Sequence, residues 1–257
     1  MSIPEDAPSP EKTGVINILL FGLDRRAPNE GARSDAMMIA TIDKKNRQVK
    51  LTSLMRDMYV SIPGKQDNRI NTGFIFGGPV LAIKTVNQNF NMNIEHYAAV
   101  DFFGFQEIID ILGGVETTLT SSEAKIIGLG SAGTYTLNGE QALSYSRIRQ
   151  IGGDYERTDR QRTVLSALFN KAKTVLLFKV PQLLANILPR IETNLSKGEM
   201  LALGKNIIDS SSKPLQELRL PIENTYKSQR IRNMAVLVPD IEKNTKALHA
   251  FIYGDND

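Results

Sequence analysis

The segment VINILLFGLDRRAPNEGARSDAMMIATIDKKNRQVKLTS, residues 15–53, contains three apolar runs separated by polar stretches. Residues 15–21, VINILLF, are mostly apolar and are followed by a glycine, which is typical of a buried strand. Residues 36–43 and 47–53 are joined by a short polar turn, and this spacing predicts an antiparallel hairpin. The segment therefore predicts the first three strands of a β-sheet.

Beyond this segment, stretches with helical spacing alternate with short strand-like runs. Helical spacing occurs at residues 79–90, 102–112, 158–175, 181–191, 197–208 and 239–253, and strand-like runs occur at 96–100, 115–119, 215–220 and 234–238. This alternation predicts one layered α/β domain over residues 14–257. Residues 1–13 are polar and proline-rich, so we expect a disordered lead-in or the remnant of a truncation.

The overall composition narrows the possible functions. The chain has 257 residues, of which 41% are hydrophobic, enough to bury a sizeable core. Its net charge is only +3 and its basic residues are clustered locally, so no nucleic-acid partner is expected. The absence of cysteine excludes thiol catalysis, cysteine-bound zinc and disulfides. No apolar run reaches the length of about 18 residues that a membrane helix needs.

Two aspartates, Asp24 and Asp35, occur where predicted strands end or begin. If the hairpin turns near Lys45, Asp35 lies across from Met55 and Arg56. Two carboxylates at neighbouring strand ends are the ligands that Mg²⁺ uses together with substrate phosphates. The alternative is ordinary, a turn aspartate and a surface ion pair.

Five arginines lie within RIRQIGGDYERTDRQR, residues 147–162. On a helix that starts at Asp154, Arg157 and Gln161 share a stripe with the apolar residues that follow. A guanidinium that points inward needs an anion, and its planar donors fit a phosphate or a carboxylate. We therefore predict a buried diphosphate site with a metal, with Arg160 on the flank of the stripe and Arg162 off it. A salt-bridged, solvent-facing helix start is the alternative.

Other short patterns carry little weight. Residues 128–133, GLGSAG, match a dinucleotide-binding fingerprint but do not follow a predicted strand. Ser122 and Lys125 match a serine–lysine motif whose companion elements are missing or out of order. His96 and His249 are far apart in the sequence, so both are interpreted as structural.

Six ordered motifs together resemble the LytR-CpsA-Psr family of bacterial cell-wall proteins. They are GLDRR at 22–26, RSDAMM at 33–38, SLMRDMYV at 53–60, NRIN at 68–71, DILGGVE at 110–116 and YSRIR with GDYERTDRQR within 145–162. The resemblance is close over residues 14–176 and looser beyond them.

This resemblance implies a phosphotransferase on the outer face of the cytoplasmic membrane. Such an enzyme moves a glycopolymer, of the wall teichoic acid or capsular polysaccharide type, from a polyprenyl diphosphate carrier to peptidoglycan. The implied fold is an α/β/α sandwich around a central mixed β-sheet, with an apolar channel for the prenyl chain. The family's usual N-terminal membrane helix has no counterpart in this sequence, so we expect the chain to be an extracellular domain.

The resemblance also implies roles for individual residues. Mg²⁺, or alternatively Mn²⁺, is expected at Asp24 and Asp35. Catalytic roles are expected for Arg56, Asp35 and Arg149. The diphosphate is expected to bind Arg26, Arg56, Arg147, Arg149, Arg157, Arg160 and Gln161.

Three points stay open at the level of sequence. The general base toward the acceptor hydroxyl is either Asp35 or Asp57. The enzyme is alternatively a metal-dependent pyrophosphatase that uses water as the acceptor. A non-catalytic regulator or wall-binding protein is the third hypothesis.

Overall fold

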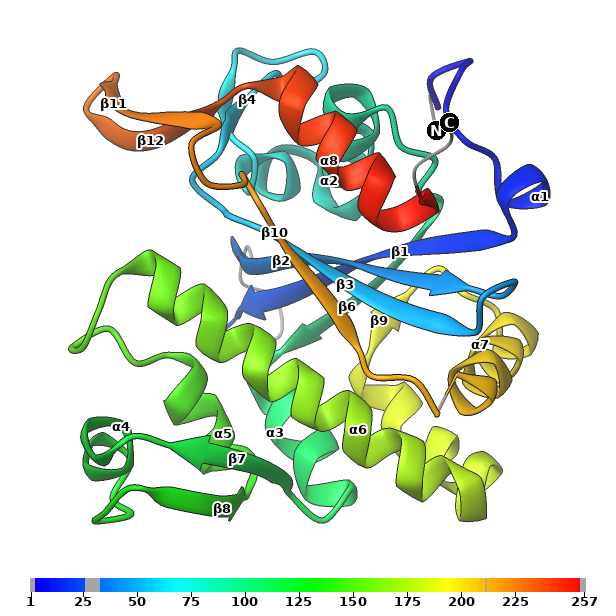
Figure 1. The fold of residues 1–257 in the computed structure, drawn as a ribbon, viewed down its shortest axis with the longest axis vertical. Helices are drawn as coiled ribbons and strands as arrows, with labels where there is room; N and C mark the ends of the chain where they lie inside the picture. Colours follow the sequence, from blue (N-terminus) through cyan, green and yellow to red (C-terminus); the bar gives the residue numbers. More distant parts are fainter. Residues whose placement is uncertain (1–2, 26–32, 211, 255–257) are drawn as a thin grey trace. The chain divides into compact units, whose positions relative to one another are not determined.

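The computed structural model describes residues 3–25, 33–210 and 212–254, without the side chains of residues 33, 154 and 175–184. Its centre is a six-stranded sheet in the order β10-β3-β2-β1-β6-β9 (Figure 1). β1 and β2 are antiparallel, as are β2 and β3, whereas β10 is parallel to β3, so the sheet is mixed as expected. The strands are β1 (Val15–Asp24), β2 (Arg33–Asp43), β3 (Gln48–Leu54), β6 (His96–Asp101), β9 (Glu192–Thr193) and β10 (Gln216–Leu220).

The chain forms two compact units, which are described separately. The first contains residues 1–99 and 193–257, and the second contains residues 100–192. Besides strands of the sheet, the first unit holds α1 (Pro10–Thr13), β4 (Tyr59–Val60), β5 (Asn68–Arg69), α2 (Thr72–Phe90), α7 (Lys197–Asp209), β11 (Tyr226–Ile231), β12 (Met234–Pro239) and α8 (Ile241–Tyr253). The second holds α3 (Phe102–Ile111), β7 (Val115–Leu119), α4 (Ser121–Ile126), β8 (Gly133–Leu137), α5 (Gly139–Ser146), α6 (Asp154–Ile187) and a 3₁₀ turn, η1 (Leu188–Arg190).

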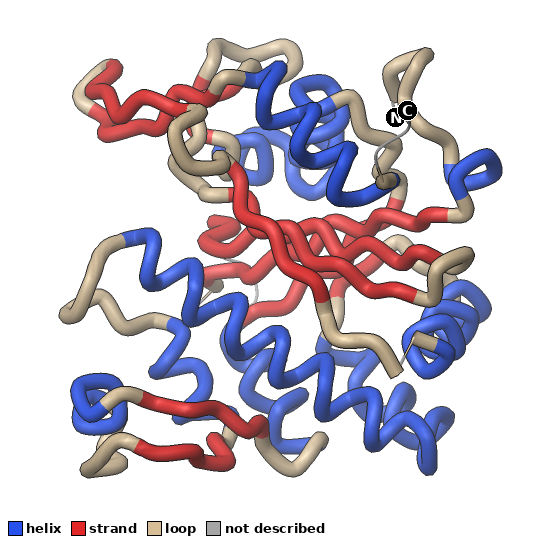
Figure 2. The backbone as a smooth tube through the Cα atoms, viewed as in Figure 1, coloured by secondary structure: helices blue, strands red, loops and turns tan. Residues whose placement is uncertain are grey.

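Helices cover both faces of the sheet within the first unit, with α2 and α8 on one side and α7 on the other (Figure 2). The alternation of side chains along β1 explains this arrangement. Phe21 packs on Phe74 of α2, with ring centroids 4.9 Å apart. Ile18 points to the opposite face of the sheet and packs with Ile42 and with Leu203 of α7. The predicted α/β/α layering is therefore present in this unit.

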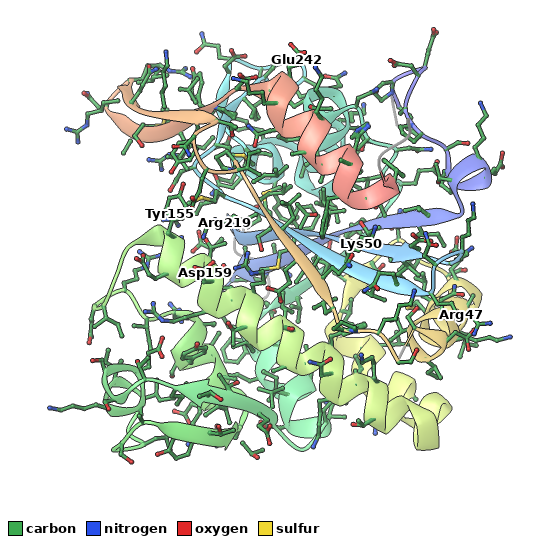
Figure 3. The ribbon with its side chains drawn as sticks, in the orientation of Figure 1. Arg47, Lys50, Tyr155, Asp159, Arg219 and Glu242 are labelled. Atoms are coloured by element: carbon green, nitrogen blue, oxygen red, sulfur yellow. The ribbon has the colours of Figure 1, made fainter. Side chains whose placement is uncertain are left out.

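Lys50 joins the sheet to the last turn of α8. It lies on the α8 side of β3 (Figure 3), and its Nζ donates to the carbonyl oxygens of Phe251 at 2.7 Å and Ile252 at 3.0 Å. Burial lowers the pKa of this ammonium, and nearby Asp43 opposes the shift. A cation at a helix C-terminus satisfies carbonyl groups that have no intrahelical partner.

A separate core holds the second unit together. It is formed by α3, β7, α5 and the first turns of α6, and Ile109, Val115, Leu137 and Val164 are completely buried in it. A capping box begins α5: the side chain of Asn138 accepts from the Gln141 backbone at 2.9 Å. This cap fixes where α5 begins and so where its C-terminal residues lie.

Several elements differ from the sequence-based expectation, among them β1, α6, α1 and β11. β1 continues beyond Gly22, because Leu23 keeps the buried alternation of the strand. α6 runs through Pro181 instead of dividing at it, since a proline removes one helical hydrogen bond without obliging the helix to end. A single helical turn, α1, lies within the expected lead-in, closed by Gly14 at a φ of 74°. The β11–β12 hairpin begins with a strand that was not expected.

Among the described residues, no helix combines the length and the apolar character that crossing a membrane requires.

Candidate functional site

The β1–β2 ladder contains a bulge at Asp35. Gly22 pairs with Ala36 and Leu23 with Ser34, so Asp35 is the extra residue between two successive rungs. A bulge redirects the side chain at the extra position, and bulges are frequent beside functional sites. The backbone therefore sets Asp35 apart from the regular alternation of β2.

Asp24 occupies the last rung of the same ladder, opposite Arg33. The two aspartates thus lie at one end of the sheet, as the sequence predicted, although β1 reaches Asp24 rather than stopping short of it. Their carboxylate oxygens are hard ligands of the kind that Mg²⁺ prefers.

Arg56 forms an ion pair with Asp35, with Nη1 of the arginine 2.9 Å from Oδ1 of the aspartate. The register that pairs Met37 with Leu54, continued two residues further, sets these two residues opposite each other. Their side chains are 22% and 23% exposed, so the pair is shielded but still open to solvent. The predicted cross-hairpin pairing is confirmed.

Asp57 extends this pair into a row of alternating charges. Its Oδ2 lies 3.6 Å from Nε of Arg56, and its Oδ1 lies 3.2 Å from Nε of Arg69. Arg69 also donates to the carbonyl oxygen of Ala235 on β12, at 2.8 Å. Two aspartates and two arginines thereby fix one another's positions at the end of the sheet, which pre-organises Arg56 for an anionic ligand. Arg69 was not among the residues predicted from the sequence to form the site.

In the second unit, two predicted arginines lie just after α5. Arg147 is the C-terminal cap of that helix, and its guanidinium carbon lies 4.3 Å from the centre of the Phe102 ring. Arg149 is exposed, whereas Ile148 between them is only 4% exposed and belongs to the core of the unit. The buried isoleucine anchors a loop that presents an arginine on either side of it.

The first turns of α6 confirm the predicted inward stripe. Arg157 is 3% exposed and Val164 is fully buried, while Gln161 is half-buried. A buried guanidinium requires compensation by hydrogen bonds or anions, because removing a charge from water is costly. Arg162, predicted to be off the stripe, pairs with Asp159 at 2.9 Å on the helix surface.

Arg160 was expected to bind the diphosphate, but its guanidinium is hydrogen-bonded within the protein. It is 7% exposed, its Nε donates to Oε1 of Glu123 at 2.8 Å, and its two terminal nitrogens donate to the carbonyl oxygens of Ile148 and Ile151. These contacts give Arg160 a structural role and do not support the predicted role in diphosphate binding. Helical spacing alone missed this, since the acceptors belong to a different helix and to a loop.

The predicted residues are divided between the two units. Asp24, Asp35 and Arg56 belong to the first, and Arg147, Arg149, Arg157, Arg160 and Gln161 belong to the second. Arg26 lies outside the described residues. Glu123 was not predicted to contribute to the site. The pair of Thr120 and Glu123, three residues apart, is nevertheless the sequence signature of a capping box.

The donor set at the end of the sheet fits a metal ion that is bound together with a phosphate ligand. In the described part of the chain, no three His, Cys, Asp or Glu side chains are grouped so that they hold a metal by themselves. Mg²⁺ is commonly bound by one or two carboxylates, with phosphate and water oxygens completing its octahedron. Asp24 and Asp35 match that pattern, and neither is a ligand type that selects zinc or copper.

Apolar side chains remain exposed on α2 of the first unit. The helix is interrupted at Gly77 and Gly78, where the backbone is not helical. Ile75, Phe76 and Val80 flank this kink and are 47%, 46% and 48% exposed. Further along α2, Ala82, Ile83, Val86 and Phe90 are fully buried and belong to the core.

Comparison with known proteins identifies the family. The family model described as LytR_cpsA_psr family matches residues 2–250. The chain belongs to this family. It is 34% identical over 221 residues to the regulatory protein MsrR of Staphylococcus aureus (strain COL), covering 83% of this chain and 67% of that protein.

Two further relatives are similar over most of their length. The polyisoprenyl-teichoic acid–peptidoglycan teichoic acid transferase TagU of Bacillus cereus (strain AH820) is 33% identical over 214 residues, which cover 82% of this chain and 70% of TagU. The crystal structure of B. subtilis TagT superimposes with a TM-score of 0.77 and 26% identity, covering 97% of this chain and 95% of TagT. The family's single α/β domain with a central mixed sheet is therefore confirmed for this chain.

Proposed function

We propose that this protein is a phosphotransferase that moves an anionic glycopolymer from a polyprenyl diphosphate carrier to peptidoglycan. The main observation behind the proposal is the burial of Arg157, which is only 3% exposed. Arginine is rarely buried to this extent unless it is paired with an anion or with hydrogen-bond acceptors. Family membership and the printed activity of TagU supply the reaction class. The polymer is of the wall teichoic acid or capsular polysaccharide type.

The residues of the chain supply the charge neutralisation that phosphoryl transfer requires. In the first unit, Arg56, fixed by Asp35 and Asp57, would neutralise phosphate charge. In the second unit, the residues proposed to bind diphosphate oxygens are Arg147, Arg149, Arg157 and Gln161. Asp24 and Asp35 would hold Mg²⁺, or Mn²⁺ in its place. When bound, this ion neutralises phosphate charge and orients the diphosphate.

The reaction exchanges one phosphorus–oxygen bond for another. A sugar hydroxyl of peptidoglycan attacks the phosphorus next to the glycopolymer, and the bond from that phosphorus to the bridging oxygen breaks. The products are a phosphodiester between polymer and peptidoglycan, and a polyprenyl monophosphate. We place this reaction on the outer face of the cytoplasmic membrane, where the lipid carrier and the wall polymer meet.

The prenyl tail of the carrier needs an apolar contact surface. Ile75, Phe76 and Val80 on α2, together with Leu201 on α7, are the large apolar side chains that are exposed in the described part of the first unit. Each CH₂ group that such a surface removes from water contributes about 0.8 kcal/mol. We propose that the tail packs against the three of these side chains that lie on α2.

A reconstituted transfer assay tests the proposal. Polyprenyl-diphosphate-linked glycopolymer, labelled in the sugar, is incubated with the protein and Mg²⁺, with and without peptidoglycan. Transfer predicts label in peptidoglycan, dependent on both components and abolished by chelation of the metal. Release of free polymer phosphate at the same rate without peptidoglycan would instead identify a pyrophosphatase.

The printed name of MsrR, a regulatory protein, favours a second candidate function. A non-catalytic regulator would bind the carrier or the wall without turnover. Binding of prenyl diphosphates with no labelled product under any acceptor condition would support that alternative.

A further inference from the structure

Arg160 joins three segments of the second unit that are distant in the sequence. Its Nε donates to Glu123, 37 residues earlier, at 2.8 Å. Nη1 donates to the carbonyl oxygen of Ile148 at 3.2 Å, and Nη2 donates to that of Ile151 at 2.9 Å. A planar guanidinium is suited to this task because its donors point in fixed directions.

The two carbonyl acceptors lie on either side of Arg149. Ile148 precedes it and is buried, and Ile151 is partly buried against the same core. Arg149 itself is exposed, and among the described residues its side chain has no hydrogen bond or ion pair. The backbone on both sides of this arginine is therefore fixed while its side chain is left to a ligand.

Glu123 divides its two oxygens between two elements. Oε1 accepts from Arg160, and Oε2 accepts from the backbone and hydroxyl of Thr120, at 3.0 and 2.9 Å, in the capping box of α4. The side chains of Glu123 and Arg160 are 12% and 8% exposed, so the pair is largely shielded from solvent. Burial by itself would raise the pKa of the Glu123 carboxyl, but the bonds from Arg160 and Thr120 outweigh it and lower that pKa.

We propose that Arg160 and Glu123 are positioning residues for Arg149: they hold residues 148–151 in the conformation that presents the Arg149 guanidinium to the carrier diphosphate. This inference rests on the proposed function through the diphosphate role of Arg149. It replaces direct diphosphate binding by Arg160, whose guanidinium is already bonded to protein acceptors on each of its three nitrogens.

A double-mutant cycle separates positioning from direct binding and from general stabilisation. Farnesyl diphosphate is titrated into the wild type, Arg160→Lys, Arg149→Ala and the double variant, in the presence of Mg²⁺. Lysine keeps the charge but cannot bridge three acceptors. We expect Arg160→Lys to weaken binding about fivefold in the wild type, in the range of coupling within one hydrogen-bond network, and less than about twofold when Arg149 is already alanine.

Glu123→Gln provides a second variant that preserves the fold. Glutamine also serves at the third position of a capping box, and it can accept one bond from Arg160, so α4 is retained. We expect it to weaken farnesyl diphosphate binding less than Arg160→Lys, with the same dependence on Arg149. Hydrogen exchange should accelerate at the amides of residues 147–153 in both variants.

The possible results distinguish failure of the positioning role of Arg160 from failure of the diphosphate role of Arg149. Equal losses from Arg160→Lys in both backgrounds would overturn positioning, since the lysine would then act independently of Arg149. Unchanged exchange at residues 147–153 would overturn it as well. Wild-type affinity in Arg149→Ala would instead remove Arg149 from the diphosphate site, a failure of the proposed function that leaves the structural contacts of Arg160 untouched.

Discussion

Asp35 and Arg56 are 21 residues apart in the chain, and their side chains meet at 2.9 Å. The ion pair has a consequence for both partners. Arg56 orients the Asp35 carboxylate, and Asp35 limits the rotamers of Arg56. The contact thereby fixes the position of Asp35 for the proposed metal and that of Arg56 for the proposed phosphate.

Replacing Asp35 with alanine tests the metal assignment at the level of one residue. Asp35→Ala should reduce transfer by at least about a hundredfold, because one of two carboxylate ligands is lost. Its unfolding free energy should fall by no more than about 2 kcal/mol, since the side chain is only partly buried. Transfer of labelled polymer and urea unfolding are the measurements.

Asp209→Ala, at the exposed end of α7, is the matched control and should behave as the wild type in both measurements. Wild-type turnover of Asp35→Ala at saturating Mg²⁺ would show that Asp35 is not a metal ligand.

Arg157 and Arg162 form a second comparison, since both start the same helix. Arg157→Lys should impair transfer nearly as much as Arg157→Ala, because an ammonium cannot reproduce a two-pronged guanidinium contact. Arg162→Lys should be nearly neutral, since its partner Asp159 lies on the helix surface. Steady-state kinetics of the three variants provide the test. Equal losses of transfer activity in Arg157→Lys and Arg162→Lys would show that the inward orientation of Arg157 is not what makes it important.

Among the helices and strands, the spacing of residues predicted those contacts that lie within one element or between two neighbouring strands. The β2–β3 register placed Asp35 opposite Arg56, and helical spacing placed Arg157 inward. Arg160 was not predictable in this way, because its acceptors come from α4 and from the loop before α6. The β11 strand was missed because its sequence, YKSQRI, is mostly polar and exposed, with no apolar alternation.

The α4–α6 link gives a prediction for pH dependence. The folded-state pKa of Glu123 lies below its ordinary value of 4.5, so its ionised form contributes stability above that pH. This contribution should be lost as the pH falls through the folded-state pKa. Urea unfolding of the wild type and Glu123→Gln should therefore differ at neutral pH and converge in acid.

Glu140→Gln is the control for this titration, since Glu140 is exposed on α5. It should leave the unfolding free energy within about 0.5 kcal/mol of the wild type at every pH. A difference for Glu123→Gln that is constant from neutral to acid pH would mean that its charge plays no part in stability.

For the molecule as a whole, the proposed function combines anion-binding residues with a lipid carrier. The sequence motifs predicted the family, the mixed sheet and the acid pair at its end. The position of the prenyl chain was not predictable, because the spacing of apolar residues does not distinguish core from ligand contact. Ala82, Ile83, Val86 and Phe90 of α2 proved to be core, whereas Ile75, Phe76 and Val80 at its kink are exposed.

Binding of prenyl diphosphates of different chain length tests whether the exposed residues of α2 contact the lipid. Affinity should rise from geranyl to farnesyl to longer prenyl diphosphates, and it should level off once the apolar surface is covered. Phe76→Ser should flatten that rise and leave binding of inorganic diphosphate unchanged. Leu201→Ser, an equally exposed apolar residue on α7, is the control. Calorimetric titration that shows no dependence on tail length would separate the diphosphate site from any lipid contact.

The central claim is that the chain forms a phosphodiester between a glycopolymer and peptidoglycan. Phosphorus NMR of the isolated wall product, after reaction with carrier-linked polymer and Mg²⁺, tests it most directly. We expect a phosphodiester resonance in peptidoglycan and an equal amount of polyprenyl monophosphate, both absent with Asp35→Ala. A phosphomonoester on free polymer, with peptidoglycan unmodified, would contradict it.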